Sequence, residues 1–312
     1  MMMPDASSRG GNGKAPLREV RVSEQVIRSC FRHAFTTEKE EVMGMLLGRL
    51  ETRRFASGSG NSGAAEIAKG AASASPPLPG SVEGKVAYIW ATHVSERSVQ
   101  SSDRVEMSPE SLASAAETAD RVSAATGVNT TVLGWYHSHP KIPVVPSAVD
   151  LRTQREHQQH FESGWVGLIV SVFNAEANLN RGHCALHCFQ AGPNNEHIQV
   201  PVHVVSVAEL FSSVEPLQAL PDSTPDLLRV LQREIGNGVR MVEEKTEHNA
   251  AAARAARGLA EAQLYELDGL VAEPTRKELL LCSLPALRAE VARLEAMLAD
   301  ARTSAPSAAK PS

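Results

Sequence analysis

Residues 135–154 (WYHSHPKIPVVPSAVDLRTQ) constrain the fold more than any other segment of the chain. On an extended strand, residues two apart point to the same side, so His137 and His139 present both imidazoles to one spot. Asp150 follows 11 residues after His139, in the first turn of a predicted helix, and the intervening loop is long enough to bring its carboxylate back. The segment therefore predicts a strand, a loop and a helix that meet at one point.

These three side chains indicate a metal centre. Two histidines and one carboxylate, with a fourth position left for water, form the ligand set of a catalytic zinc site. The same ligand types also form the facial triad that holds non-haem Fe(II), so the residues alone leave iron open as an alternative. We expect one catalytic zinc ion, held by His137, His139 and Asp150.

Strand and helix patterns alternate around this segment. Helical patterns cover residues 23–35, 108–127 and 147–161. Strand patterns rich in apolar and β-branched residues lie at 41–50, 85–94, 130–139, 165–173, 183–190 and 197–205. Strands mixed with helices predict an α/β or α+β domain that spans residues 22–208, and we take α/β as the fold class.

Three segments have compositions that favour disorder. Residues 1–21 are small, polar and Gly-rich, and we interpret them as a disordered leader. Twenty of the 25 residues at 56–80 are Ser, Gly, Ala or Pro, which predicts a disordered insertion at about 52–82. Residues 303–312 are expected to form a disordered tail.

The C-terminal region, residues 225–302, is rich in Ala, Leu, Glu and Arg and is predicted to be helical. Apolar residues recur there in steps of three and four, as the seam of a coiled coil requires: Leu284, Leu287, Val291, Leu294 and Leu298. Pro274 and Pro285 divide the region, so we expect two or three helices. Pairing with a partner's helix and packing as a hairpin on its own domain both remain open.

Charge and cysteine content narrow the classes of partner. Lys and Arg total 31 and Asp and Glu total 36, a formal charge of −5, so no overall basic field favours nucleic acid or an anionic membrane. The four cysteines are too few and too scattered to stabilise a chain of 312 residues through disulfide bonds. No apolar run of membrane-spanning length occurs in the sequence. We expect a nuclear or cytosolic protein that neither inserts into membranes nor binds nucleic acid directly.

The order of these residues is similar to the motif of a known enzyme family. His137-Ser-His139-Pro140, then Ser147 and Asp150, with an upstream Glu41 in Glu-Val-Met-Gly, resembles the JAMM (MPN-plus) motif of metal-dependent deubiquitinases. Further runs, TEKEEVMG at 37–44, DRVEMSPE at 103–110 and PSAVDLRTQ at 146–154, look like the lysine-63-specific deubiquitinase subunits of BRISC and BRCA-A-type complexes.

The resemblance implies an MPN fold, a mixed β-sheet flanked by helices, followed here by the helical region. It implies a zinc metalloprotease that hydrolyses isopeptide bonds in lysine-63-linked polyubiquitin. It also implies an Abraxas-like MPN-minus partner, bound through the MPN domain and the C-terminal helices. Two alternatives stay open: a JAMM isopeptidase for another linkage or ubiquitin-like modifier, and a non-catalytic MPN scaffold.

The resemblance also assigns catalytic roles to Glu41 and Ser147. Glu41, expected on a strand, would act as general base toward water and then as acid toward the leaving lysine amine. Ser147 would donate a hydrogen bond to the oxyanion. Because Ser147-x-x-Asp150 is also a capping-box pattern, a purely structural role for the serine remains an alternative.

A second cluster, His183, Cys184, His187 and Cys188, invites a second zinc site. On a straight strand the two histidines, and likewise the two cysteines, are four residues or about 13 Å apart, too far to share one ion. We therefore expect these residues to serve packing. His157 and His160 are three apart on a predicted helix, where a solvated surface is the simpler interpretation.

Overall fold

The computed structural model describes residues 15–56, 81–96, 107–161, 164–175, 182–211, 223–245 and 249–267, together with 220, 269, 288, 291–293 and 295. The chain divides into two compact units, residues 1–230 and 231–312. The first unit contains the sheet and the metal-ligand candidates.

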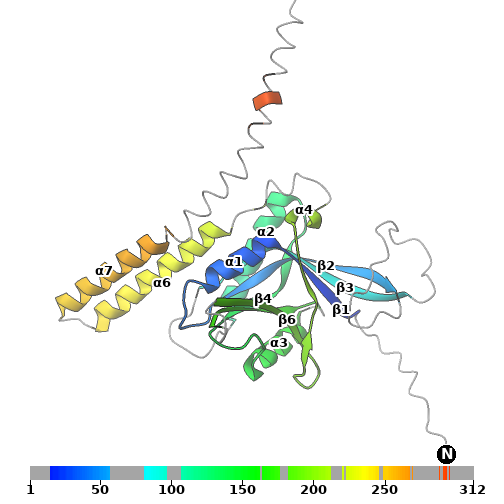
Figure 1. The fold of residues 1–312 in the computed structure, drawn as a ribbon, viewed down its shortest axis with the longest axis horizontal. Helices are drawn as coiled ribbons and strands as arrows, with labels where there is room; N and C mark the ends of the chain where they lie inside the picture. Colours follow the sequence, from blue (N-terminus) through cyan, green and yellow to red (C-terminus); the bar gives the residue numbers. More distant parts are fainter. Residues whose placement is uncertain are drawn as a thin grey trace, which may run out of the picture. The chain divides into compact units, whose positions relative to one another are not determined.

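One mixed sheet organises the first unit (Figure 1). Its eight described strands are β1 (Leu17–Ser23), β2 (Met43–Ala56), β3 (Ser81–Val94), β4 (Thr131–Pro140), β5 (Val166–Ala175), β6 (Gly182–Ala191), β7 (His197–Gln199) and β8 (Val202–Val205). They lie in the order β7-β6-β5-β4-β2-β3-β1-β8. The pairs β1/β3, β1/β8 and β4/β5 are parallel and the other four pairs are antiparallel. Strand β4 therefore lies inside the sheet, between β2 and β5.

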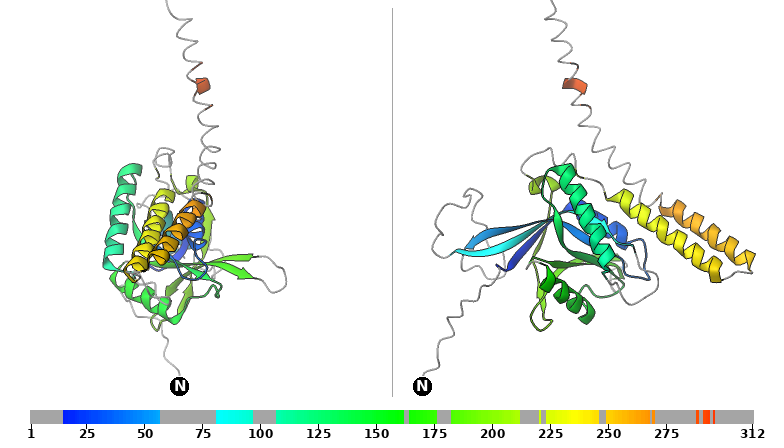
Figure 2. Two further views of the ribbon diagram at one scale, coloured as in Figure 1. Left: turned by 90° about the vertical axis from the view of Figure 1, so that its left-hand side faces the viewer. Right: turned by 180° about the vertical axis from the view of Figure 1, so that it is seen from behind.

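Helices cover both faces of the sheet (Figure 2). Helix α1 (Glu24–Ala34) buries Val26, Cys30 and Ala34 in an apolar cluster on one face. On the other face, α2 (Pro109–Thr126) buries Ala115, Ala119 and Val122, and α3 (Ala148–His160) packs beside β6 and β5. The predicted mixed sheet flanked by helices is confirmed, and the face covered by α2 and α3 is the one that carries the metal-ligand candidates.

Two predicted boundaries are wrong at the sheet. Strand β1 begins at Leu17, inside the predicted leader, because this charged segment pairs in parallel with β3 on one side and β8 on the other. The hairpin of β2 and β3 continues to the pair Ala56 and Ser81, so both ends of the predicted 52–82 insertion are strand. Residues 57–80 lie outside the described residues, as do 1–14.

The predicted strand at 197–205 is also two strands in the structure. Pro201 separates β7, which pairs with β6, from β8, which pairs with β1 at the opposite edge of the sheet. The break is consistent with proline, because its missing N–H cannot continue a ladder of hydrogen bonds.

The remaining described elements are helical: α4 (Val207–Leu210), α6 (Thr224–Lys245) and α7 (Ala250–Leu267). Within the second unit, the side chain of Arg257 contacts Glu243 at 2.6 Å (Nε to Oε1) and joins α7 to the end of α6. Of the predicted coiled-coil seam only Val291 is described; Leu284, Leu287, Leu294 and Leu298 lie outside the described residues, as does the tail at 303–312. Among the described helices, none has the length and apolarity to cross a bilayer.

Candidate metal centre

The centre starts from two buried histidines on β4. His137 and His139 alternate with Ser138, so both rings lie on the same face of the sheet, as the spacing predicts. Their Nε2 atoms are 3.0 Å apart and their ring centroids 4.8 Å apart, with an interplanar angle of 63°. The two rings thus direct one nitrogen each toward the same point.

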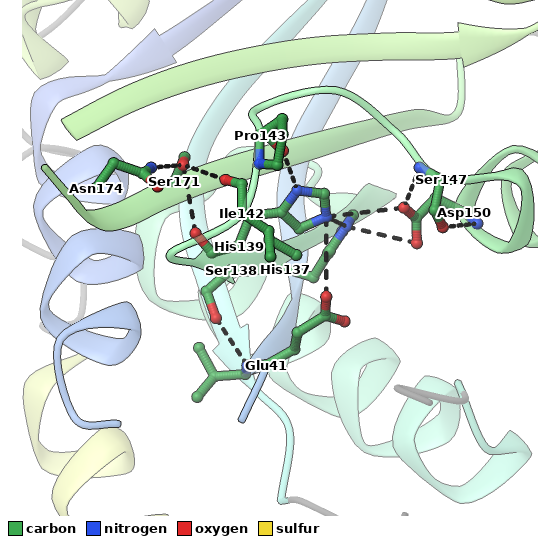
Figure 3. A network of polar contacts seen from close by, with 11 residues as sticks. Glu41, His137, Ser138, His139, Ile142, Pro143, Ser147, Asp150, Ser171 and Asn174 are labelled. Carbon is green, nitrogen blue, oxygen red and sulfur yellow. Dashed lines mark hydrogen bonds and ion pairs between the residues drawn. The ribbon is translucent and has the colours of Figure 1, made fainter. Parts of the chain in front are cut away.

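The carboxylate of Asp150 reaches that point from the first turn of α3. Its Oδ1 lies 3.6 Å from His137 Nε2, and its Oδ2 lies 3.7 Å from His139 Nε2. Figure 3 shows the carboxylate and the His139 ring facing one another across the site. Among the described residues, these three side chains are the one group of three or more His, Cys, Asp or Glu residues arranged to hold a metal ion.

The spacing of these atoms fits a zinc ion. Two ligands at about 2.0–2.1 Å from one tetrahedral ion lie about 3.3 Å apart, close to the three separations in the site. His139 Nδ1 lies 2.7 Å from the carbonyl oxygen of Pro143; as the donor to it, Nδ1 leaves the Nε2 lone pair free for a metal. The three residues therefore fit the zinc ion that the motif implies.

Aromatic packing holds the ring of His137 in place. His137 stacks on Trp135 at a centroid distance of 4.5 Å and an angle of 14°. Trp135 Nε1 donates to Gln154 Oε1 on α3 at 2.8 Å, so one hydrogen bond ties the ligand strand to the ligand helix. Gln154 in turn donates from Nε2 to the carbonyl oxygen of Trp165.

The charges around the site favour a cation. Burial would raise the pKa of Asp150, but contacts with His137, His139 and Ser147 hold it far below its usual range, so the carboxylate is ionised. Burial would likewise lower the pKa of His139, yet Asp150, the Pro143 carbonyl and Glu41 together raise it. The raised pKa of His139 shows that the nearby carboxylates stabilise positive charge at this point, and the lowered pKa of Asp150 keeps its carboxylate ionised as a ligand.

Glu41 lies beside the three ligands, although not on a strand as predicted. It precedes β2 in an irregular segment, and its Oε1 is 3.9 Å from His139 Nε2 (Figure 3). Two contacts at 2.9 Å fix this segment to β4: Val42 N donates to Ser138 Oγ, and Ser138 N donates to the Val42 carbonyl. Burial raises the pKa of Glu41, although the nearby histidines oppose the shift.

Close packing explains the glycine of the Glu-Val-Met-Gly run. A Cβ at Gly44 would lie 2.4 Å from the carbonyl oxygen of His93 and 2.5 Å from the Tyr136 ring. A larger residue would therefore push β2, and Glu41 with it, away from β4.

Ser147 is the N-cap of α3, within the capping box that the sequence allows. Its Oγ accepts from Asp150 N at 3.2 Å, and its own N–H donates to Asp150 Oδ2 at 2.6 Å. The box aims the ligand carboxylate as well as capping the helix. The oxyanion role of Ser147 stays a prediction.

Sequence reasoning missed the residues that support the ligand loop. Ser171 is fully buried opposite His139 on β5, and its Oγ lies 3.3 Å from the His139 carbonyl and 3.2 Å from the Ile142 carbonyl. Asn174 donates to the same Oγ (Figure 3). No local pattern around Ser171 marks it, because the two carbonyl groups that it contacts in the ligand loop are about thirty residues away in sequence.

The other predicted candidates lie apart from the centre. Cys188 is buried and Cys184 is exposed, so the two thiols face different surroundings, and the side chain of His183 lies outside the described residues. His187 contacts His197 instead of its neighbours on β6. On α3, the ring of His157 lies near-parallel to those of Phe161 and Trp165, which stack on each other, and His160 contacts the Glu156 carbonyl at the exposed side.

Comparison with known proteins agrees with this site. Residues 15–163 match the sequence profile of the JAB1/Mov34/MPN/PAD-1 ubiquitin protease family. The chain is 38% identical over 197 residues to the Lys-63-specific deubiquitinase BRCC36 of Rattus norvegicus, a match that covers 61% of this chain and 64% of that protein. The proteins of the same name from Pongo abelii and Homo sapiens are 37% and 33% identical, with 56% and 61% of this chain and 68% and 67% of theirs covered.

The chain thus spans slightly less than two thirds of the rat relative and slightly more than two thirds of the orangutan one. The region that matches the family profile, residues 15–163, includes strands β1 to β4, helices α1 to α3 and all five residues of the predicted motif. On this fold and these similarities, the chain belongs to the JAB1/Mov34/MPN/PAD-1 ubiquitin protease family.

Proposed function

We propose that the chain is a zinc-dependent isopeptidase that hydrolyses lysine-63-linked polyubiquitin. One observation carries the proposal: the Nε2 atoms of His137 and His139 and the carboxylate of Asp150 converge within 3.0 to 3.7 Å, with the Glu41 carboxylate beside them. A scaffold has no need for three buried ligands and an adjacent base held at this spacing.

Each residue has a separate task in hydrolysis. His137, His139 and ionised Asp150 would hold the metal; when bound, zinc supplies Lewis acidity toward a carbonyl and lowers the pKa of water toward about 7. Glu41 takes a proton from the attacking water as the water oxygen bonds to the isopeptide carbon. Glu41 then gives that proton to the lysine amine as the carbon–nitrogen bond breaks, so the carboxylate is regenerated.

Ser147 is the oxyanion donor in this proposal. Its Oγ accepts the Asp150 N–H, which leaves the hydroxyl hydrogen available to an oxygen in the site. The capping and catalytic roles use different atoms of the hydroxyl group, so they are compatible.

The linkage and the assembly rest on similarity. The relatives are named Lys-63-specific deubiquitinases, which supports lysine-63-linked chains as the substrate. We further propose that the chain acts as the catalytic subunit of a hetero-oligomer with an Abraxas-like MPN-minus partner, which its MPN domain and C-terminal helices contact. The nuclear or cytosolic location expected from composition is part of the same proposal.

A panel of di-ubiquitins of every linkage tests the proposal. The full chain, co-expressed with a candidate MPN-minus partner, is assayed as purified, after zinc chelation and after zinc is restored, with the Glu41→Gln complex as control. We expect cleavage confined to the lysine-63 linkage, lost on chelation and recovered with zinc. Cleavage of other linkages would contradict the substrate assignment, and no cleavage by a zinc-loaded complex would favour the scaffold.

A further inference from the structure

A second pair of histidines has nearly the same geometry as the first. His187 on β6 and His197 on β7 bring their Nε2 atoms to 2.7 Å, with ring centroids 4.8 Å apart and an interplanar angle of 53°. The corresponding values for His137 and His139 are 3.0 Å, 4.8 Å and 63°. In both pairs the same ring nitrogen of each residue points at its partner.

The turn between β6 and β7 creates this second pair. Gly192 N donates to the Glu196 carbonyl at 2.8 Å, and Asn195 adopts a left-handed conformation with φ of 58°. Arg155 on α3 donates to Asn195 Oδ1 at 3.3 Å, which fastens the turn to the helix that carries Asp150. The hairpin thus brings together two residues that are ten positions apart in sequence.

The two pairs lie on one face of the sheet. Across the strands, His137 pairs with Ile169 and Ile169 pairs with His187, so the second pair begins two strands from the first, at roughly 10 Å. Buried aromatic rings lie between them: Trp135 stacks on His137 and contacts Phe189, and His187 stacks over Phe189. The ring of His187 therefore packs against buried aromatic side chains of the sheet.

We propose that His187 and His197 form a second site for a divalent transition metal, separate from the catalytic centre. Imidazole nitrogens suit zinc, copper, nickel and cobalt, whereas magnesium and calcium prefer oxygen ligands. Among the described residues no third His, Cys, Asp or Glu ligand joins this pair, so water completes the coordination. His197 is exposed and His187 is buried, which lets an ion approach from solvent onto a fixed ligand.

The state of His187 agrees with a ligand role. Burial, together with the charges of His197 and His139, lowers the pKa of His187, so its ring is neutral at neutral pH. A direct hydrogen bond between the two rings is the competing arrangement, because one neutral ring can donate to the other at 2.7 Å. A metal-binding measurement distinguishes these two interpretations, because a bound ion would replace the hydrogen bond between the rings.

Zinc titration of the chelator-stripped full chain against a competing chromophoric chelator tests the proposal. We expect two classes of site, one tight and one weaker, because two protein ligands hold an ion less firmly than three. His187→Gln and His197→Gln each remove the weaker class. His203→Gln, which changes an exposed histidine on β8, serves as the matched control and keeps both classes.

The His139→Ala variant separates the two sites. It should lose the tight class and keep the weaker one, whatever reaction the first site performs. Identical weak binding in the wild type and in His197→Gln would overturn the proposal, as would the absence of any second class. Cobalt substitution gives an independent reading, since a visible band at the second equivalent should disappear in His187→Gln and persist in His203→Gln.

Discussion

Two histidine pairs on the same sheet face differ in what surrounds them. Both pairs oppose Nε2 atoms at 3.0 Å or less, but the pair on β4 is buried, with Asp150 in contact with both rings and Glu41 close by. The pair on β6 and β7 is open to solvent on the His197 side and has no carboxylate among its described metal-ligand candidates. Two facing imidazoles are therefore common to both regions and do not by themselves make a catalytic centre.

The two pairs also differ in their electrostatic surroundings, which shift the pKa of a histidine upward at the first pair and downward at the second. At the first pair, neighbouring carboxylates raise the pKa of His139 against the effect of burial. At the second pair, burial and neighbouring histidines lower the pKa of His187. A cation is thus favoured by fixed negative charge at the first pair and only by neutral nitrogen lone pairs at the second. Under the two proposals, Asp150 and Glu41 are the residues that distinguish the catalytic metal centre from the accessory one.

The largest expected effect comes from breaking the first pair. His139→Ala should abolish tight zinc binding and lower the cleavage rate roughly a thousandfold or more, because several kcal/mol of transition-state stabilisation leave with the metal. Metal content by atomic emission and single-turnover cleavage measure both effects, with His203→Ala as control. A variant with one tight zinc and full rate would show that the pair on β4 is not the ligand pair.

Glu41→Gln should separate metal binding from turnover. The amide keeps the shape of the side chain but cannot accept a proton from water, so zinc content should stay at the wild-type level while kcat falls by about 10²- to 10⁴-fold. Glu40→Gln is the matched control at the neighbouring position. If the Glu41→Gln enzyme turned over at the wild-type rate, the base would have to be another group.

Ser147→Ala should affect both stability and rate. Loss of the N-cap costs about 1 kcal/mol, and loss of an oxyanion donor lowers kcat by about 10²- to 10³-fold. The variant keeps the backbone N–H that donates to Asp150, so zinc should remain bound. Ser108→Ala removes the corresponding N-cap of α2, where Ser108 Oγ accepts from Ser111 N, and should lower only stability. Equal kinetic effects in the two variants would leave Ser147 with a capping role alone.

Much of the first site follows from local sequence. The two-residue spacing on a strand places His137 and His139 on one face, and a capping-box pattern places Asp150 in the first turn of a helix. Both signals act over a few residues, so no knowledge of the sheet order is needed. The alternating patterns likewise predicted a domain of mixed strands and helices, whereas the mixed sheet flanked by helices was implied by the resemblance to the JAMM family.

What could not be predicted depends on contacts between distant segments. The position of Glu41 off the strand follows from Ser138, 96 residues away from Val42. Strand β1 begins at Leu17 because β3 pairs with it from that residue, and β8 pairs with it from Val20 onward. The second pair escaped the local spacing argument because its partner, His197, lies across a hairpin from His187 rather than on the same strand.

Two buried serines give the smallest expected effects and the sharpest test of which contacts build the first site. Ser171 Oγ contacts the carbonyls of His139 and Ile142, so Ser171→Ala loosens the ligand loop and should weaken zinc binding by about tenfold. Ser138 Oγ accepts from Val42 N, next to the base, so Ser138→Ala should leave zinc affinity unchanged. Its kcat should fall roughly tenfold, less than the ~100-fold that a 1 Å misplacement can cost.

Each serine variant serves as the other's control, because both serines are fully buried in the sheet and each substitution removes one hydroxyl group. Zinc affinity by chelator competition and kcat at saturating zinc give four values, and the expected pattern is crossed: affinity falls in Ser171→Ala, and kcat falls in Ser138→Ala. Parallel losses in both variants would mean that the sheet responds as one unit. The ligands and the base would then share a single support, and the distinction between holding the metal and placing the base would fail.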